Sequence, residues 1–379
     1  MTRARVNGEG SIFQRKSDGR WIGTVTVGWR DGKQLRKVVS AKTAQEARAK
    51  LDVLRATVGT GIVTSNKVTV DVLLDRWFDD VLSGQVAPNT ADNYRTIANR
   101  HLRPMLGKRP VAKLTTTEID RLLAAKRAAG LSVSTVRRIR SVLAQALTQA
   151  QRWEMVGRNV ATLSTAPKAR RTEGRSLTVA DANRLFAVLK GHRLEALYVT
   201  MLGTGLRRGE ALGLRWEDVD LSGAVVVVRH QLKREAGRLV LGDVKTTSSR
   251  RAVNLPGFVV ASLRAHKKRQ TTERLAAGPV WRDSGHVFTT TIGTPIDPRN
   301  IGRDFASMTE AAGLGHWHPH ELRHSAASIM LAQGVPIEVV SNVLGHASIR
   351  MTADVYGHIQ APQRQAAADA MTEALSTSG

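Results

Sequence analysis

Near the N-terminus, apolar and polar residues alternate in short runs, a pattern typical of strands that bury one face. Asp-Gly dipeptides at 18–19 and 31–32 separate the runs, and such dipeptides favour tight hairpin turns. The pattern predicts three strands, at residues 11–14, 21–29 and 35–40. A helix is expected next, because Thr43 and Glu46 have the spacing of a capping box and apolar residues then recur on one helical face.

From residue 68 onward the apolar positions follow a helical period. Amphipathic stretches are predicted at residues 68–83, 89–106, 115–129 and 132–153. Thr115 and Glu118 form a second capping-box pair, and Gly130 supplies a helix stop. The buried stripe of the last stretch is predicted to consist of Val136, Ile139, Leu143 and Leu147.

Two segments rich in small residues separate the predicted domains. Residues 59–66 are small and polar, and residues 164–174 (STAPKARRTEG) are small and basic. Beyond them the pattern is mixed, with helices near 178–190 and 194–203 and strands near 224–230, 239–244 and 250–255. The sequence therefore predicts a multidomain, mainly α chain with α+β parts: a small ββ(β)α module at 1–60, a helical domain at 67–165 and a mixed α+β domain at 174–379.

The 379 residues include 57 Lys and Arg against 32 Asp and Glu, a formal net charge of +25. This charge favours a polyanionic partner such as DNA or RNA, although a merely soluble basic protein would share it. Residues 1–60 are themselves strongly basic, which predicts a small DNA-binding module. In the helical domain, Arg137, Arg138 and Arg140 flank the buried stripe, where they either contact a phosphate backbone or form a solvated face.

The sequence has no cysteine, which excludes a disulfide framework, a thiol nucleophile and zinc fingers that need thiolates. The N-terminus lacks the apolar core of a signal peptide, and no apolar run reaches the roughly 18 residues of a membrane span. We therefore expect a cytosolic protein without a membrane contact. Its chemistry has to come from other side chains.

The predicted C-terminal domain contains short motifs with candidate chemistry: TGLRRGEAL at 204–212, HELR at 320–323, LGH at 344–346, and Tyr356. Each motif is weak alone, but their order in a strongly basic chain suits phosphodiester cleavage. That reaction needs an in-line nucleophile, positive donors for the two non-bridging oxygens, and an acid for the leaving hydroxyl.

Arginine suits the donor role, because its planar fork makes paired hydrogen bonds to phosphate and keeps its charge. Arg207 and Arg323 are the predicted phosphate-binding arginines. Lys245 is the candidate general acid, because it lies at a predicted turn between two strands, from which a lysine could reach the leaving oxygen.

Three tyrosines are candidates for a phenol nucleophile. Tyr94 falls on a helical face, and Tyr198 lies between Leu197 and Val199 in an apolar helix, so both are predicted to be structural. Tyr356 is the candidate nucleophile, because it lies near the chain end among small and polar neighbours, where a packing role is less expected.

Together, TGLRRGEALGL, HELRH, LGH and the terminal tyrosine resemble the signature of the tyrosine recombinases, or phage integrases. The resemblance implies that the residues around the scissile phosphate are Arg207, Lys245, His320, Arg323 and His346. It also implies Tyr356 as the nucleophile and Glu210 as a support for Arg207. Lys233 is the alternative to Lys245, because loop lengths vary in this part of the family.

The resemblance further implies a reaction and a set of partners. Such a recombinase cleaves and rejoins DNA through a 3′-phosphotyrosine and a free 5′-hydroxyl, with four protomers on two DNA sites and without ATP, cofactor or metal. The module at 1–60 would bind arm-type sites, the domain at 67–165 would be a SAM-like core-binding domain, and a helix within 361–375 would pack into a neighbouring protomer. The expected function is integration of phage or mobile-element DNA into a bacterial chromosome, in the host cytoplasm, with an excisionase and a host DNA-bending protein as further partners.

Three other functions have to be weighed against this one. HELRH also satisfies the zinc motif H-E-x-x-H, with His316 and His318 nearby, which would indicate a metalloprotease. However, Pro319 makes His320 a helix start instead of a mid-helix ligand, and a protease does not need so basic a chain. A non-catalytic DNA-binding regulator would explain the charge but not the complete set of donors. A type IB topoisomerase would share the tyrosine chemistry, but the basic N-terminal module argues against it.

Overall fold

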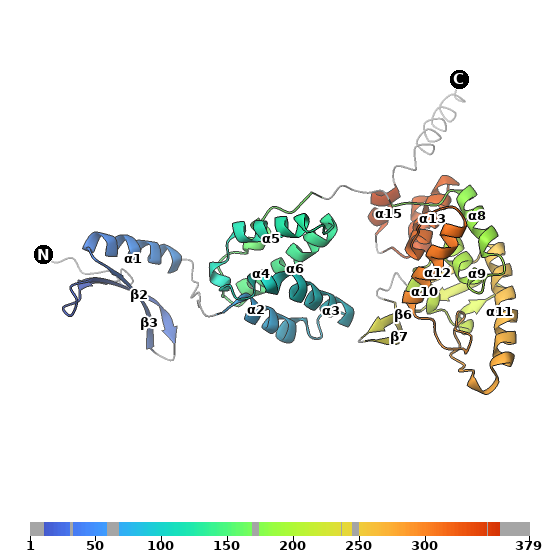
Figure 1. Cartoon of the computed structure of the whole chain (residues 1–379), viewed down its shortest axis with the longest axis horizontal. Helices are drawn as coiled ribbons and strands as arrows, with labels where there is room; N and C mark the ends of the chain where they lie inside the picture. Colours follow the sequence, from blue (N-terminus) through green and yellow to red (C-terminus); the bar gives the residue numbers. More distant parts are fainter. Residues whose placement is uncertain are drawn as a thin grey trace, which may run out of the picture. The chain divides into compact units, whose positions relative to one another are not determined.

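The computed structural model describes residues 11–30, 33–58, 68–168, 174–235, 237–244, 250–346 and 348–356. It divides the chain into two compact units, Met1–Arg170 and Arg171–Gly379, and each is considered by itself. Helices dominate the described elements and small sheets accompany them (Figure 1). The predicted class, mainly α with α+β parts, is therefore confirmed. Residues 59–66 and 169–173, which belong to the predicted linkers, lie outside the described residues.

The first unit begins with an antiparallel sheet of order β1-β2-β3, followed by one helix. The elements are β1 (Ser11–Gln14), β2 (Trp21–Arg30), β3 (Lys33–Ala41) and α1 (Ala44–Val58). Helix α1 packs on β2 through Ala47 and Leu51, which are fully buried. The Thr43 hydroxyl accepts a hydrogen bond from the backbone N–H of Glu46 at 3.2 Å and so caps the helix. The predicted strands and helix are confirmed.

The rest of this unit is helical and follows the predicted amphipathic stretches closely. Its elements are α2 (Val70–Arg76), a π-helical turn (Trp77–Leu82), α3 (Pro88–Ile97), a second π-helical turn (Ala98–Leu102), α4 (Arg103–Leu106), a 3₁₀ turn (Val111–Lys113), α5 (Thr116–Ala128), α6 (Val133–Arg152) and α7 (Val160–Leu163). Thr115 and Glu118 form the predicted capping box at the start of α5. The core of this part contains the predicted stripe of α6, Val136, Ile139, Leu143 and Leu147.

The second unit combines a helical body with short strands. Its elements are α8 (Val179–Leu189), α9 (Glu195–Thr204), α10 (Arg208–Leu212), a 3₁₀ turn (Trp216–Asp218), β4 (Val219–Asp220), β5 (Val225–Val228), β6 (His230–Glu235), β7 (Arg238–Asp243), β8 (Arg251–Asn254), α11 (Gly257–Ala277), a second 3₁₀ turn (Gly278–Val280), α12 (Pro298–Ala311), α13 (Pro319–Ala332), α14 (Ile337–Leu344) and α15 (Ile349–Tyr356). Helix α9 is buried along almost its whole length and forms the centre of the core.

The strands of this unit form two separate antiparallel groups, β4-β5-β8 and the hairpin β6-β7. This corrects the prediction of one strand at 224–230, because β5 ends at Val228 and β6 begins at His230 in the other group. Between them, Arg229 forms an ion pair with the buried Asp218 at 3.1 Å, where the chain leaves the first group. The predicted strands at 239–244 and 250–255 therefore do not pair with each other. The β6-β7 hairpin projects from the helical body of its unit (Figure 1).

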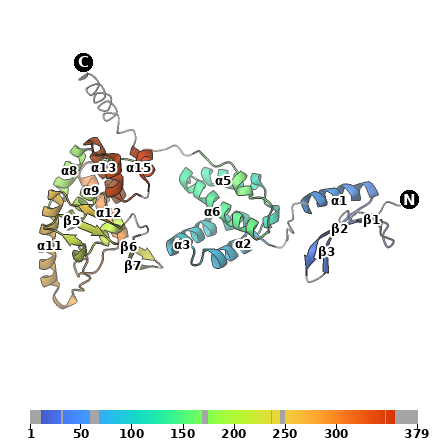
Figure 2. The ribbon, with the colours of Figure 1, turned by 180° about the vertical axis from the view of Figure 1, so that it is seen from behind.

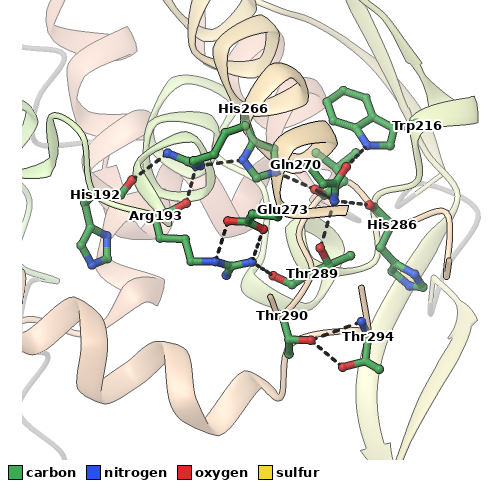
Figure 3. A network of polar contacts seen from close by, with 12 residues as sticks. His192, Arg193, Trp216, His266, Gln270, Glu273, His286, Thr289, Thr290 and Thr294 are labelled. Carbon is green, nitrogen blue, oxygen red and sulfur yellow. Dashed lines mark hydrogen bonds and ion pairs between the residues drawn. The ribbon is translucent and has the colours of Figure 1, made fainter. Parts of the chain in front are cut away.

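A buried polar network holds the segment that leads into α12 against helix α11 (Figure 3). The Gln270 amide accepts a hydrogen bond from Trp216 Nε1 at 2.7 Å and donates one to Thr289 Oγ1 at 3.0 Å. Beside it, Arg193 and Glu273 form a bidentate ion pair with N–O distances of 3.0 and 2.8 Å. Because buried polar groups are stabilised only when they are hydrogen-bonded, this network fixes a segment that has little regular structure.

Helix α11 runs along one side of the second unit (Figure 2). It spans 21 residues and carries basic residues over much of its length, including Arg264, Lys267, Lys268 and Arg269. No helix in the described part of the chain is both long and apolar enough to span a bilayer.

Candidate active site

The first element of the candidate site is the tight connection between α9 and α10. Gly205 ends α9 in the left-handed conformation, with φ of 65°, which favours glycine because a side chain would be strained there. Arg207 then forms the N-cap of α10, and its backbone N–H donates to Glu210 Oε2 at 3.0 Å. The Arg207 side chain donates to the other carboxylate oxygen, Oε1, at 2.7 Å. The motif TGLRRGE thus presents an arginine at a helix start with its orientation fixed by Glu210.

The second element is helix α13, which begins at Pro319. The predicted helix start before His320 is therefore confirmed. Arg323 lies one turn further along the helix, is only 3% exposed, and donates from Nη1 to the Gly205 carbonyl at 2.8 Å. Residues three apart lie on neighbouring positions of a helix face, so His320 and Arg323 project from the same side. The hydrogen bond brings the predicted Arg323 to the connection that carries Arg207.

The third element is the turn between α14 and α15. Gly345 is again left-handed, with φ of 66°, and its carbonyl accepts a hydrogen bond from Arg207 Nη2 at 3.2 Å. The next residue, His346, makes a 2.7 Å hydrogen bond through Nδ1 to the hydroxyl of Thr352, a fully buried residue of α15. Backbone carbonyls therefore connect the two predicted arginines to the parts of the chain that carry the other predicted donors.

Positive charge gathers where these elements meet and changes the titration of both histidines. Burial and then the charges of Arg323 and Arg207 lower the pKa of His346 to about 4. Desolvation, His324 and Arg323 lower the pKa of His320, with a further effect from Arg207. Both imidazoles are therefore neutral near pH 7 in the free protein, and each retains an N–H donor.

Glu210 holds a second arginine that the sequence analysis missed. Arg251, at the start of β8, forms an ion pair from Nη2 to Glu210 Oε2 at 3.1 Å. Burial acts to raise the pKa of Glu210, but the charges and hydrogen bonds of Arg251 and Arg207 outweigh it and lower the pKa. A signal was present in the sequence, because Arg251 alternates with the buried Val253 and Leu255 and so occupies an inward-facing position.

The sequence of this chain matches a known protein family and several characterised relatives. Residues 175–363 match the sequence model described as "Phage integrase family", and residues 69–126 match its N-terminal SAM-like domain. An integrase of Streptomyces ambofaciens is 34% identical over 94% of this chain and 94% of its own length. The chain belongs to the phage integrase family. A XerC-like tyrosine recombinase of Caldanaerobacter subterraneus subsp. tengcongensis is 29% identical to this integrase-family chain. The match covers 92% of this chain and 95% of the recombinase.

Solved structures show the same fold in other integrases. A Tn1549 transposon integrase in complex with circular intermediate DNA matches with a TM-score of 0.69 at 22% identity, covering 80% of this chain and all of that one (100%). A lambda integrase tetramer bound to a Holliday junction matches with a TM-score of 0.58 at 19% identity, covering 91% and 97%. These solved structures show the shared fold, whereas the matches to the family model and to the curated integrase and tyrosine recombinase favour a recombinase over the topoisomerase and the non-catalytic regulator considered above.

Two predicted residues of this integrase-family site lie wholly or partly outside the described residues. Lys245, the candidate acid, lies outside the described residues, as does the predicted terminal helix at 361–375. Tyr356 is the last residue of α15, four positions after Thr352, and its side chain lies outside the described part. The alternative lysine, Lys233, is on β6 and forms an ion pair with Glu235 at 2.6 Å. That carboxylate engages the Lys233 ammonium, and Lys245 stays the predicted acid with Lys233 as the alternative.

The predicted DNA-binding arginines of α6 differ in their surroundings. Arg137 and Arg138 are exposed, as a contact with a phosphate backbone requires. Arg140 instead donates to the carbonyl oxygens of Thr162 and Ser164, at 2.8 and 3.0 Å, and so holds the chain that follows α7. The prediction of phosphate contact is therefore better supported for the first two than for Arg140.

The zinc hypothesis drawn from HELRH finds little support in the geometry. The His320 and His324 rings are close, with centroids 5.2 Å apart. Glu321, however, which would be the general base, forms an ion pair with Arg175 at 3.0 Å and accepts a hydrogen bond from the His318 N–H at 2.7 Å. Among the described residues, no group of three or more histidine, aspartate or glutamate side chains is arranged to hold a metal ion.

Proposed function

We propose that this integrase-family chain cuts and rejoins DNA through a covalent 3′-phosphotyrosine bond to Tyr356, and that it integrates phage or mobile-element DNA into a bacterial chromosome. One observation carries the proposal: Arg323 donates to the carbonyl of Gly205 and Arg207 donates to the carbonyl of Gly345, so that the motifs meet in one cationic cluster. Such a cluster suits a phosphodiester, because aimed positive donors stabilise the charge that develops on its oxygens.

Each predicted residue has a role in this reaction. Arg207 and Arg323 hold the non-bridging oxygens, and His320 and His346 donate further hydrogen bonds to them. A Thr352 hydroxyl that donates to Nδ1 of His346 would leave the proton on Nε2, as this role requires. The phenol oxygen of Tyr356 forms a bond to phosphorus and loses its proton to water, while the bond to the 5′-oxygen breaks and that oxygen takes a proton from Lys245, which water then reprotonates. Attack by the 5′-hydroxyl of another strand reverses these steps.

The domains and partners of the chain are proposed from the same likeness. The helical domain at 67–165 would bind the core site, and the basic module at 1–60 would bind arm-type sites. The active assembly would be a homotetramer on two DNA sites in the host cytoplasm, as the lambda integrase tetramer on a Holliday junction suggests. An excisionase and a host DNA-bending protein would control its direction.

The class of reaction is tested by covalent trapping without metal or ATP. Purified protein is mixed in EDTA with nicked DNA taken from either side of its own gene, where the attachment site is expected. We expect an adduct that resists denaturation, because the cationic side chains stabilise the transition state without a metal and the ester conserves the bond energy. Loss of cleavage in EDTA that zinc restores would instead favour the metalloprotease-like H-E-x-x-H site.

The role of the N-terminal module is tested by removing residues 1–60. We expect cleavage at the core site to persist, whereas integration that needs distant arm sites should fall sharply, because the truncation removes a strongly basic module. Footprinting of both proteins on the full attachment site measures the difference. An unchanged footprint with full integrative activity would reduce the module to a folding or solubility element.

A further inference from the structure

Arg251 is a buried charge whose surroundings need an explanation. Its side chain is only 8% exposed, at the first position of β8. Burying a guanidinium is strongly unfavourable unless it is paired and hydrogen-bonded, so a buried arginine is held by specific partners. The partners of Arg251 therefore indicate what its charge does.

Those partners are the same two structures that orient Arg207. Arg251 Nη2 lies 3.1 Å from Glu210 Oε2, and its Nε donates to the Val343 carbonyl at 2.7 Å, in the last turn of α14. A Cβ atom built on Gly345 would come within 2.8 Å of Arg251 Nη1, so the guanidinium packs directly against that glycine. Glu210 and Gly345 in turn accept the hydrogen bonds of the Arg207 side chain.

We propose that Arg251 is a positioning residue, which fixes Glu210 and the turn at Gly345 so that Arg207 and His346 are aimed at the scissile phosphate. The inference rests on the proposed strand-cleavage function and extends it to a residue that need not touch DNA. A displacement of reacting groups by about 1 Å can cost about 100-fold in rate, which is the scale expected for such a residue.

The charge balance supports the same role. With Arg207 alone, the Glu210 carboxylate would neutralise the arginine that has to attract phosphate. With Arg251 as a second partner, one carboxylate is shared between two guanidinium groups, and the cluster keeps a net positive charge. Arginine suits this position better than lysine, because its planar fork reaches the carboxylate and the Val343 carbonyl from different nitrogens.

The test compares Arg251→Gln and Arg251→Lys with Arg250→Gln, a matched control at the preceding, exposed arginine. Single-turnover cleavage of nicked site DNA is measured at saturating protein, so that differences in DNA affinity do not enter the rate. We expect Arg251→Gln to slow cleavage by about 10- to 100-fold and Arg251→Lys to recover part of it, with dissociation constants close to wild type. Arg250→Gln should cleave at the wild-type rate.

A pH profile separates positioning from a general structural role. His346 faces Arg323 and His324 on α13, Arg207 at the start of α10, Arg251 on β8 and Thr352 on α15. These positive charges, together with burial, lower its pKa to about 4. Protonation of His346 at Nδ1 would end the hydrogen bond that this nitrogen accepts from Thr352 and so release the ring, which would give the rate profile an acid limb. Removing the Arg251 charge raises the pKa of His346, so this limb should move to higher pH in Arg251→Gln but not in Arg250→Gln.

A double-mutant cycle with Glu210→Gln completes the test. If Arg251 acts through Glu210, the double variant Glu210→Gln/Arg251→Gln should lose much less than the product of the single losses. Multiplicative losses, an unmoved pH profile, or a wild-type rate in Arg251→Gln would overturn the inference. If Arg251→Gln does not fold, as a thermal melt would show, the rate and profile of Arg251→Lys decide the question. A wild-type protein that forms no adduct refutes the proposed function instead, so the two failures are distinguishable.

Discussion

Replacing Tyr356 by phenylalanine is expected to abolish the covalent protein–DNA adduct and all strand exchange, while DNA affinity and folding stay close to wild type. The substitution removes one oxygen and keeps the ring, so packing and assembly should survive. The phenol oxygen is the atom that would bond to phosphorus, and no partial activity is expected without it. Denaturing gels of protein trapped on nicked site DNA measure the adduct, and binding assays on the same DNA measure affinity.

The contacts of the other two tyrosines favour structural roles for them. Tyr198 is fully buried in α9, and its hydroxyl donates to Asp304 Oδ2 at 2.6 Å. Burial and that carboxylate raise the pKa of the Tyr198 phenol, which keeps it protonated. Tyr94 belongs to the first unit, where its ring stacks on Trp77 with centroids 5.8 Å apart. The prediction that both are structural is therefore supported by their contacts.

Tyr198→Phe is the matched control for Tyr356→Phe. It removes the same atom from the same residue type, and it should cost about 1–3 kcal/mol of stability, because the buried phenol of Tyr198 no longer donates to the half-buried Asp304 carboxylate. Adduct formation should nevertheless be retained below the melting temperature. An adduct that persists in Tyr356→Phe, or a DNA-linked peptide that contains Tyr198 or Tyr94, would overturn the assignment of the nucleophile.

Much of the fold could be predicted from sequence, because local signals and tertiary packing agree in the helical parts. Thr115 and Glu118 cap α5 as their spacing predicts, and the helical period of α6 places its apolar stripe in the core. The strands of the second unit were harder to predict. The valine run of β5 continues into His230 without a turn dipeptide, and it is the buried Asp218 and its ion pair with Arg229 that mark the end of the strand.

In the candidate site, too, some features could be predicted from sequence and others could not. The motifs identify Arg207, Arg323 and His346 by residue type and order, but not the carbonyl groups that connect them. Those connections depend on left-handed turns at Gly205 and Gly345, which place backbone oxygens against side chains distant in sequence. Arg251 was not predicted, for a related reason: its partners lie 41 and 92 residues away along the chain. In addition, two adjacent arginines in a sequence usually indicate a solvated surface.

Substituting alanine for Arg207 or Arg323 is expected to remove cleavage while DNA binding remains. Loss of one aimed donor typically costs about 100- to 1000-fold in rate, whereas affinity for DNA is spread over many phosphate contacts. The two variants should differ in stability. Arg207 is 36% exposed, and although its loss removes one donor from the buried Glu210, Arg251 and the backbone N–H of residue 207 still hold that carboxylate. Arg323 is 3% exposed and holds the Gly205 carbonyl, so Arg323→Ala should also lower the melting temperature.

Arg323→Lys and Arg208→Ala are the controls for that pair of variants. Arg323→Lys keeps the charge but not the planar fork, so it should fold better than Arg323→Ala and still cleave poorly. Arg208 is the exposed neighbour of Arg207, and its removal tests whether any arginine at this helix start is sufficient. Single-turnover cleavage at saturating protein, with the dissociation constant measured on the same DNA, gives the comparison. Wild-type cleavage by Arg207→Ala or Arg323→Ala would show that other residues hold the phosphate. Equal losses of DNA binding and of cleavage would show that these arginines contribute affinity and not transition-state stabilisation.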